Sequence, residues 1–279
     1  MIKIMVDSAS YIEKDYALKH DITIVPLKVL YKGTEFEEGS PGEFDEFFED
    51  FTKTKIFPKT SQPSVERFTE EFNKAIDNGN EVLLFTISSA LSGTYNSACL
   101  ARENCKNKDM VTVYDSDGNC QTYAGYAMDA VEMRDQGKNV KEILEHIEKI
   151  KHNSQVSFAP DSLEYLKKGG RIGKVTATLG TILQLKPILT FKEGTLVCEK
   201  KCLGMQKAIG DLISLIPNRI KRLFVLHIAN TKFFEILKKK VDEFLAKTKE
   251  KIEVIVSEVG PVVASHVGPA VGLSWTALE

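Results

Sequence analysis

Short apolar segments rich in valine and isoleucine alternate along the first half of the chain with segments of amphipathic, helical periodicity. The apolar segments are Ile2–Asp7, Ile22–Tyr31, Glu81–Ile87 and Met110–Asp115. The helical segments between and after them are Tyr11–Lys19, Glu43–Lys53, Pro63–Asp77, Tyr95–Asn104, Asn119–Asp135 and Val140–Lys151. Parallel strands need long crossover connections, usually helices, so this alternation predicts an α/β fold with a doubly wound, mostly parallel sheet.

The pattern changes after about residue 153, where short strands replace the long helices. Ile188–Phe191 and Thr195–Glu199 flank Lys192-Glu193-Gly194, which is typical of a β-hairpin with a glycine turn. Three more segments form a further α/β unit: the strands Arg222–Ile228 and Ile252–Glu258, and a helix over Phe233–Lys247. We therefore predict two domains, an α/β domain over 1–153 and a second α/β domain with a β-hairpin over 154–279.

The charge balance and the cysteine pattern exclude several classes of protein. Lysine plus arginine number 37 against 39 for aspartate plus glutamate, so the chain lacks the basic excess of nucleic-acid-binding proteins. No apolar run approaches the roughly 18 residues of a membrane helix, and the N-terminus lacks a secretory apolar core. Five cysteines without a CxxC pair indicate reduced thiols, and the scattered histidines form no metal motif. We expect a cytoplasmic protein without metal, cofactor or nucleic acid.

Hydroxyl side chains follow several predicted strands, at the edge where open parallel sheets bind ligands. In Thr60-Ser61-Gln62-Pro63-Ser64 and in Ser88–Thr94 they stand beside a helix start, and Gly93 lets the backbone approach a ligand. Free amides and the positive end of a helix favour an anion at such places. The spacing is equally compatible with a clamp on one carboxylate or phosphate and with simple capping. For Ser8 and Ser116 a capping or turn role is favoured.

A serine hydrolase is the alternative that these serines raise. The GxSxG elbow is absent, and no third member of a triad accompanies Ser92 and a histidine. His266, in the glycine-flanked loop Ser265–Pro269, could donate to a bound carboxylate or cap a loop carbonyl. GxxxxGK[ST] and GxGxxG are also absent, so nucleotide binding of those kinds is unsupported. The residues favour binding over catalysis, and an esterase or acyltransferase using Ser92 stays as the alternative.

Six motifs in order along the chain resemble the DegV family, whose members are similar to the fatty-acid-binding subunit of bacterial fatty acid kinase. They are MVDSAS at 5–10, TSQPS at 60–64, ISSALSGTYNSA at 87–98, LKKGGRI at 166–172, LKPIL at 185–189 and GPVVASHVGP at 260–269. Each motif alone is weak, but their order spans the chain from the first predicted strand to the last loop.

The resemblance implies a two-domain α/β protein that holds one long-chain fatty acid, such as palmitate or oleate, and does no chemistry itself. It implies that Thr60 and Ser92 hold the carboxylate, with Ser61, Gly93 and His266 beside them and the last loop of the second domain returning to this site. A separate ATP-dependent kinase subunit would phosphorylate the carboxylate for phospholipid synthesis, and the binding subunit would contact a membrane surface transiently. Segments Ile22–Leu30 and Val175–Leu189 are candidates for lining the acyl chain.

Two departures from the family pattern bear on these expectations. The stretch Gly268–Leu273 is one residue shorter than is usual in the family, which leaves the local backbone and the orientation of the His266 side chain open. Leu203 stands where many members carry an arginine that helps to dock the kinase. Arg171 is retained and is the expected partner-facing residue, with a salt bridge that ties down the glycine loop as its alternative role. A lipid sensor without a kinase partner is therefore a further alternative.

Overall fold

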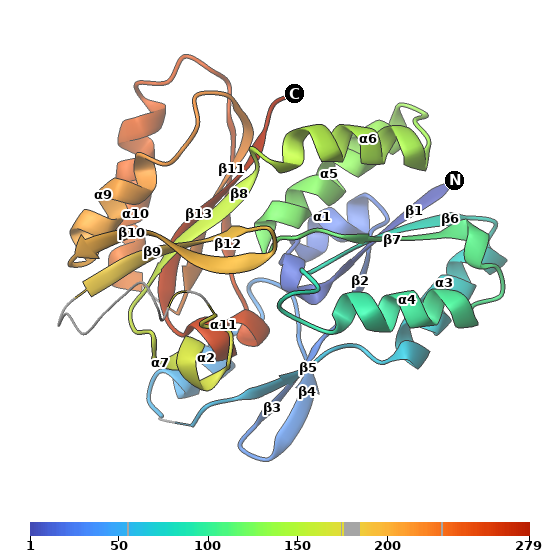
Figure 1. The fold of residues 1–279 in the computed structure, drawn as a ribbon, viewed down its shortest axis with the longest axis horizontal. Helices are drawn as coiled ribbons and strands as arrows, with labels where there is room; N and C mark the ends of the chain where they lie inside the picture. Colours follow the sequence, from blue (N-terminus) through green and yellow to red (C-terminus); the bar gives the residue numbers. More distant parts are fainter. Residues whose placement is uncertain (55, 174, 176–184, 230) are drawn as a thin grey trace.

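The computed structural model describes residues 1–54, 56–173, 175, 185–229 and 231–279. Its first sheet has the order β2-β1-β6-β7, with all neighbours parallel. The strands are β1 (Ile2–Asp7), β2 (Thr23–Val25), β6 (Glu81–Thr86) and β7 (Val111–Asp115). Strand β1 connects to neighbours on both of its sides, so the predicted doubly wound parallel sheet is confirmed (Figure 1).

Helices cover both faces of this sheet. One face packs on α3 (Val65–Asp77) and α4 (Thr94–Asn104) through a cluster that includes Phe68 and Phe72. The other face packs on α5 (Gln121–Asp135), with α6 (Val140–Lys151) behind it and α1 (Lys14–Lys19) nearby. The short 3-10 helices η1 (Ser8–Ser10) and η2 (Lys108–Met110) sit in the connections.

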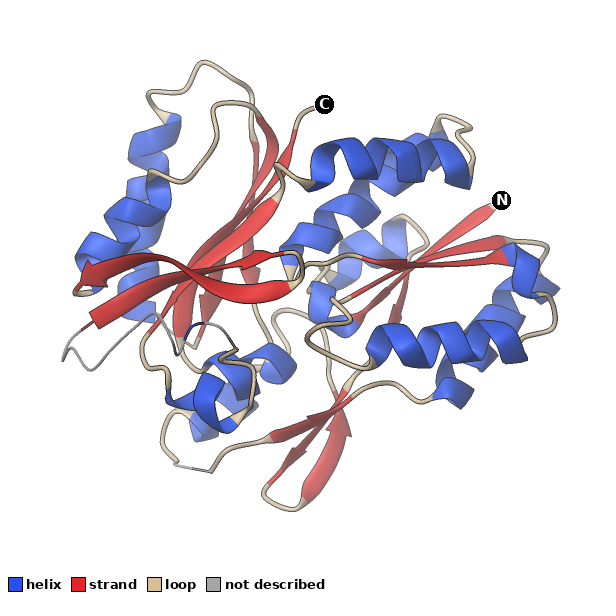
Figure 2. Cartoon of the chain, in the orientation of Figure 1, coloured by secondary structure: helices blue, strands red, loops and turns tan. Residues whose placement is uncertain are grey.

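The second sheet has six strands in the order β10-β9-β8-β13-β11-β12 (Figure 2). They are β8 (Gln155–Pro160), β9 (Leu185–Lys192), β10 (Thr195–Leu203), β11 (Ile220–Ile228), β12 (Glu253–Glu258) and β13 (Ala270–Ala277). Helices α9 (Met205–Ile213) and α10 (Thr231–Leu245) cover one face, and the other face turns toward α5. The predicted hairpin is confirmed as β9 and β10, but only β11 and β12 of this sheet run parallel.

A small antiparallel sheet, β4-β3-β5, lies below the two larger sheets in the view of Figure 1. Its strands are β3 (Lys28–Tyr31), β4 (Thr34–Glu37) and β5 (Lys59–Ser61), and α2 (Asp45–Phe51) follows β4. Phe44, Phe48 and Phe51 are buried, so the apolar face of this helical segment belongs to the core. Helices α7 (Glu164–Lys168) and α11 (Pro261–Val267) pack against each other beside this sheet.

Several predicted boundaries are wrong, each for a local reason. The extended segment Ile22–Tyr31 breaks at Pro26-Leu27 into β2 and β3, which belong to different sheets. The first helix begins at Lys14 because Tyr11 closes η1 with a positive φ of 53°. The segment around His266, predicted as a loop, forms helix α11, and the strand β13 that follows it was not predicted. None of the helices in the described part of the chain has both the length and the apolar character needed to cross a bilayer.

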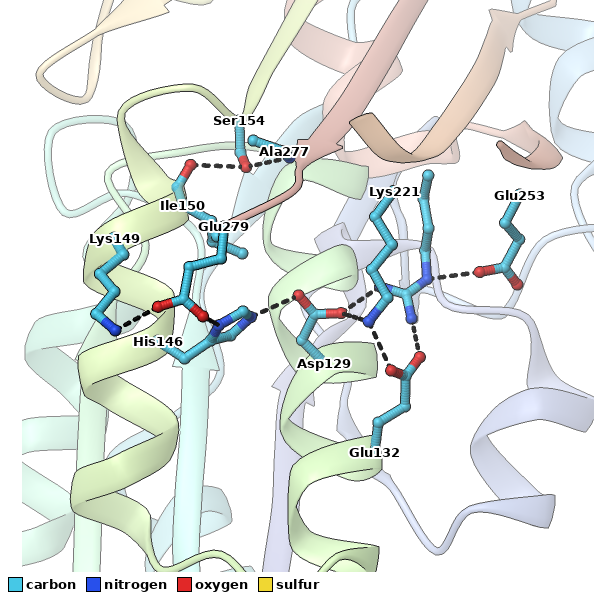
Figure 3. A network of polar contacts seen from close by, with 11 residues as sticks. Asp129, Glu132, His146, Lys149, Ile150, Ser154, Lys221, Glu253, Ala277 and Glu279 are labelled. Atoms are coloured by element: carbon cyan, nitrogen blue, oxygen red, sulfur yellow. Dashed lines mark hydrogen bonds and ion pairs between the residues drawn. The ribbon is translucent and has the colours of Figure 1, made fainter. Parts of the chain in front are cut away.

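A buried ion network joins α5 to the second sheet (Figure 3). The guanidinium of Arg222 on β11 bonds the carboxylates of Asp129 and Glu132 on α5, and its Nε donates to Glu253 at 2.7 Å. The side chains of Asp129 and Arg222 are each only 1% exposed. Burial alone would raise the pKa of Asp129, but the hydrogen bond from His146 and the charges of Arg222 and Lys221 lower it to about 2. The Asp129 carboxylate is therefore ionised and holds α5 against β11.

Replacement of Asp129 by asparagine should lower the free energy of unfolding by about 3 kcal/mol, because it leaves the buried Arg222 guanidinium without its buried counter-ion. Urea denaturation at pH 7 measures this change. The control is Glu49→Gln, which removes an exposed ion pair with Lys53 and should change stability little. Equal stability of the two variants would contradict a structural role for the network.

Candidate functional site

A cavity between the three sheets brings together three of the polar side chains expected at a ligand site and the arginine expected to face a partner. Thr60, Ser92, Arg171 and His266 line it together with Asn119. Its remaining lining is apolar: Leu27, Ile87, Leu91, Phe158, Leu166, Phe191, Leu196, Val262, Val263 and Val267. The space between its lining atoms is about 540 Å³, part of it open to solvent. The arrangement suits a molecule with one polar end and a long apolar body.

Thr60 and His266 are in direct contact although 206 positions separate them in the chain. Thr60 lies on β5, its hydroxyl oxygen is 2.8 Å from His266 Nε2, and His266 lies in the last turn of α11. Burial, and secondly the charge of Arg171, lower the pKa of His266 to about 4. The imidazole is therefore neutral near pH 7. Its buried Nδ1 has no hydrogen-bond partner among the described residues.

The Ser92 loop runs from the end of β6 to the start of α4. Its backbone is fixed at the start by the carboxylate of Asp7, which accepts from the Ile87 N–H at 2.7 Å. Ser92 Oγ lies 2.8 Å from Thr94 Oγ1 and accepts from the Thr94 N–H. Gly93 precedes the 11-residue helix α4 without a side-chain cap. The loop therefore presents a hydroxyl beside the positive end of a helix.

The two loops expected to form one clamp do meet. A Cβ on Gly93 would overlap the side chain of Gln62, so the absence of a side chain there permits the contact. Gln62 Nε2 also donates to Ser97 Oγ at 2.8 Å, which ties the TSQPS segment to α4. Because these loops approach each other closely, Thr60 and Ser92 line the same cavity.

Not every expected feature of the TSQPS segment lies at the cavity. Ser61 is exposed and does not contribute to the lining. The helix after this segment begins at Val65 instead of Pro63, and the Ser64 hydroxyl caps it by accepting from the Arg67 N–H at 3.2 Å. Ser64 therefore already binds one of the amides that this helix start was expected to offer to an anion.

Arg171 follows α7 in the glycine stretch and is exposed at the cavity. Its guanidinium donates to the backbone carbonyls of Gly169 at 2.6 Å and Leu91 at 3.4 Å. No carboxylate pairs with Arg171 within the described residues, so a salt bridge that holds the glycine loop is not seen there. The carbonyl bonds link the α7 loop to the Ser92 loop instead.

A second, mostly apolar cavity adjoins the first. The two share the lining residues Asn119, Phe158, Phe191, Val263 and Val267. Its other lining residues include Cys120, Val156, Leu226, Ile228, Val259 and Ala270, and its empty space is about 350 Å³. These residues come from the start of α5, from β8 and β11, and from the segments around α11 and β13. The shared lining places apolar space next to the cavity that Thr60 and Ser92 line.

Sequence patterns identified only part of this lining. From the predicted segment Ile22–Leu30, Leu27 faces the cavity, whereas residues 176–184 of the other predicted segment lie outside the described part of the chain. The α11 valines and the β8–β9 phenylalanines were missed. In the sequence they are apolar residues near His266 and near the hairpin. Residues of an ordinary buried core give the same pattern, so the sequence did not distinguish cavity lining from core.

The contacts of Ser92 and His266 differ from those of a hydrolase. Ser92 bonds Thr94 and His266 bonds Thr60, so no serine–histidine pair forms. The lowered pKa of His266 makes it a weak general base at neutral pH. Among the described residues, histidine, cysteine and acidic side chains form no group that could hold a metal ion.

Known proteins match the chain along nearly its whole length. The family model for uncharacterised proteins of the DegV family matches residues 1–278. A DegV domain-containing protein of Clostridium acetobutylicum is 32% identical over 264 residues, which cover 93% of this chain and 91% of that protein.

Solved structures agree with this match. A fatty-acid-binding DegV family protein of Thermus thermophilus has a TM-score of 0.88 at 30% identity, covering 99% of both chains. A stearic acid-binding protein of Eubacterium ventriosum has a TM-score of 0.87 at 30% identity, covering 99% of this chain and 98% of that one. DegV of Bacillus subtilis, a fatty acid binding protein, has a TM-score of 0.87 at 28% identity, covering 99% of both. The chain belongs to the DegV family.

Proposed function

We propose that this protein binds one long-chain fatty acid and presents its carboxylate to a partner kinase that forms an acyl phosphate. The observation that carries the proposal is the cavity itself, whose lining combines Thr60, Ser92 and His266 with mostly apolar side chains. Fatty acids are bound by several proteins of the same fold, including the one from Thermus thermophilus.

The head group would lie between the hydroxyls of Thr60 and Ser92. A carboxylate that leaves water needs several hydrogen-bond donors to offset its lost hydration. A proton on His266 Nε2 would be donated to Thr60 Oγ1, which turns the threonine hydroxyl hydrogen toward the ligand. The positive end of α4 adds favourable electrostatics.

The acyl chain would extend into the adjoining apolar space past Phe158 and Phe191. Each buried methylene contributes roughly 0.8 kcal/mol, so a chain of palmitate or oleate length supplies most of the affinity. Hydroxyl donors then need only orient the carboxylate. A head group held without a direct ion pair deep in the protein remains accessible for transfer to another active site.

Catalysis would come from the partner, because this site holds no serine–histidine pair and no strong base. Arg171, exposed at the cavity, is the residue proposed to contact the kinase. Leu203, at the end of β10, is 69% exposed and stands where the family resemblance would place an arginine that docks the kinase. A lipid sensor without a kinase is therefore the second candidate. The transient membrane contact implied by the family resemblance stays a prediction.

Protein purified from a bacterial host should contain fatty acid, and Thr60→Ala combined with Ser92→Ala should reduce the bound amount at least about tenfold, since two hydrogen bonds to a charged group are lost. Solvent extraction followed by mass spectrometry measures the ratio of acid to protein. Ser61→Ala is the matched control, because Ser61 is exposed and outside the cavity. Full occupancy of the double variant would refute the proposed clamp.

Arg171→Ala should lower acyl phosphate formation while leaving fatty acid retention within about twofold, since Arg171 lies at the exposed edge of the cavity. The assay combines the protein, ATP and the kinase subunit of a bacterial fatty acid kinase. No acyl phosphate from the wild-type protein would instead favour the lipid sensor.

Between about pH 6.5 and pH 4 the wild-type protein should lose more stability on acidification than a His266→Gln variant, because of the His266 imidazole. The pKa of about 4 lies below the ordinary value of 6.5, so the unfolded chain takes up the proton first and the folded state loses stability. Between pH 7 and 4.5 this amounts to about 2 kcal/mol. Urea titrations of wild type and His266→Gln at several pH values test this; parallel curves for the two proteins would show that His266 is not held neutral.

A further inference from the structure

Glu38, the residue after β4, is a buried carboxyl group that does not line the head-group cavity. It is 5% exposed, and its oxygens accept from the Ser8 hydroxyl at 2.6 Å and the Tyr11 hydroxyl at 3.1 Å. A third bond comes from the backbone N–H of Val262 at 2.7 Å. Val262 lies in the first turn of α11, where N–H groups have no acceptor within the helix.

Tyr11 completes the attachment of this turn. Its hydroxyl oxygen accepts from the N–H of Val263 at 3.1 Å, so neighbouring amides at the start of α11 are bound by Glu38 and Tyr11. Gly260, the residue before the helix, supplies no side-chain cap. A Cβ there would come within 2.6 Å of the Phe44 ring and 2.9 Å of Glu38 Oε1, so the close approach needs glycine.

The small sheet therefore holds α11 at both ends. Glu38 follows β4 and binds the first turn, while Thr60 on β5 bonds His266 in the last turn. Between these points Val262, Val263 and Val267 face the cavity. Because α11 has only seven residues, a shift of its first turn moves His266 as well.

We propose that Glu38 is a positioning residue of the head-group site: it holds the first turn of α11 and thereby sets where His266 and the Thr60 hydroxyl stand relative to the ligand carboxylate. This inference rests on the proposed function. It assigns to Glu38 a larger effect on the binding of the head group than on that of the acyl chain, which separates it from a general contribution to stability.

The chemistry of Glu38 suggests which substitutions are informative. Burial raises the pKa of Glu38 to about 7, although the bonds from Ser8, Val262 and Tyr11 act to lower it. A neutral glutamine is therefore a close substitute: its carbonyl oxygen can take the place of Oε1, which accepts from both Tyr11 and Val262. Alanine removes every acceptor and leaves the Val262 N–H unsatisfied.

The experiment compares the binding of palmitate with that of hexadecanol, which has the same chain length without a carboxylate, using delipidated protein and a displaced fluorescent fatty acid as the readout. Glu38→Ala should weaken palmitate binding roughly tenfold and change hexadecanol binding less than about twofold. Glu38→Gln should restore palmitate binding to within about threefold of wild type. Tyr11→Phe, which keeps the ring but loses the bond to Val263, should show the same selectivity as Glu38→Ala.

Asp129→Asn is the matched control, since Asp129 is an equally buried acid that bonds α6 and β11 and does not touch α11. It should lower thermal stability without changing the ratio of the two affinities. An unchanged ratio in both Glu38→Ala and Tyr11→Phe overturns the inference; if Glu38→Ala does not fold, Tyr11→Phe alone decides. Wild-type protein that binds neither ligand overturns the proposed function, and the inference with it.

Discussion

Helix α5 is packed between the two large sheets and fixes their positions relative to each other. Residues Gln121 to Val131 are buried without a break, so the helix has no solvent-facing side over three turns. One side contacts β1 and the other contacts β13. Asp129 and Arg222 lock the helix to β11 near its end. The cavity opens near the other end of α5, where its lining includes Asn119, just before the helix, and Ile87, just after β6.

Three buried acids lie where structural elements meet, and they differ in whether their partners are charged or neutral. Asp129 meets Arg222 and Lys221, and its pKa falls to about 2. Asp7 and Glu38 meet only hydroxyls and amides, and burial raises their pKa values to about 6 and about 7. The first arrangement forms an ionic contact between α5 and β11, outside the lining of the cavity. The second arrangement fixes backbone amides near the cavity through hydrogen bonds, without a direct ion pair.

The polar end of the site comes from four separate parts of the chain. Thr60 is on a small antiparallel sheet, Ser92 on a loop after β6, Arg171 after α7 and His266 on α11. Hydroxyls and a neutral imidazole can hold an anion by directional hydrogen bonds, whereas Arg171, the one cation among the described residues that line the cavity, is exposed. Such a site can hold a carboxylate and still release it, which suits a protein whose ligand is to react elsewhere.

The amino-acid sequence alone determined the alternating strands and helices of the first half, the doubly wound sheet and the β9–β10 hairpin, because periodicity and turn residues act locally. Motif order pointed to Thr60, Ser92 and His266, and these do line one cavity. Only the tertiary structure decided that Ser61 points to solvent, that His266 lies on a helix held by Glu38, and that β13 pairs between β8 and β11. Those features depend on contacts between residues more than a hundred positions apart, such as Glu38 with Val262, and no local pattern encodes such a contact.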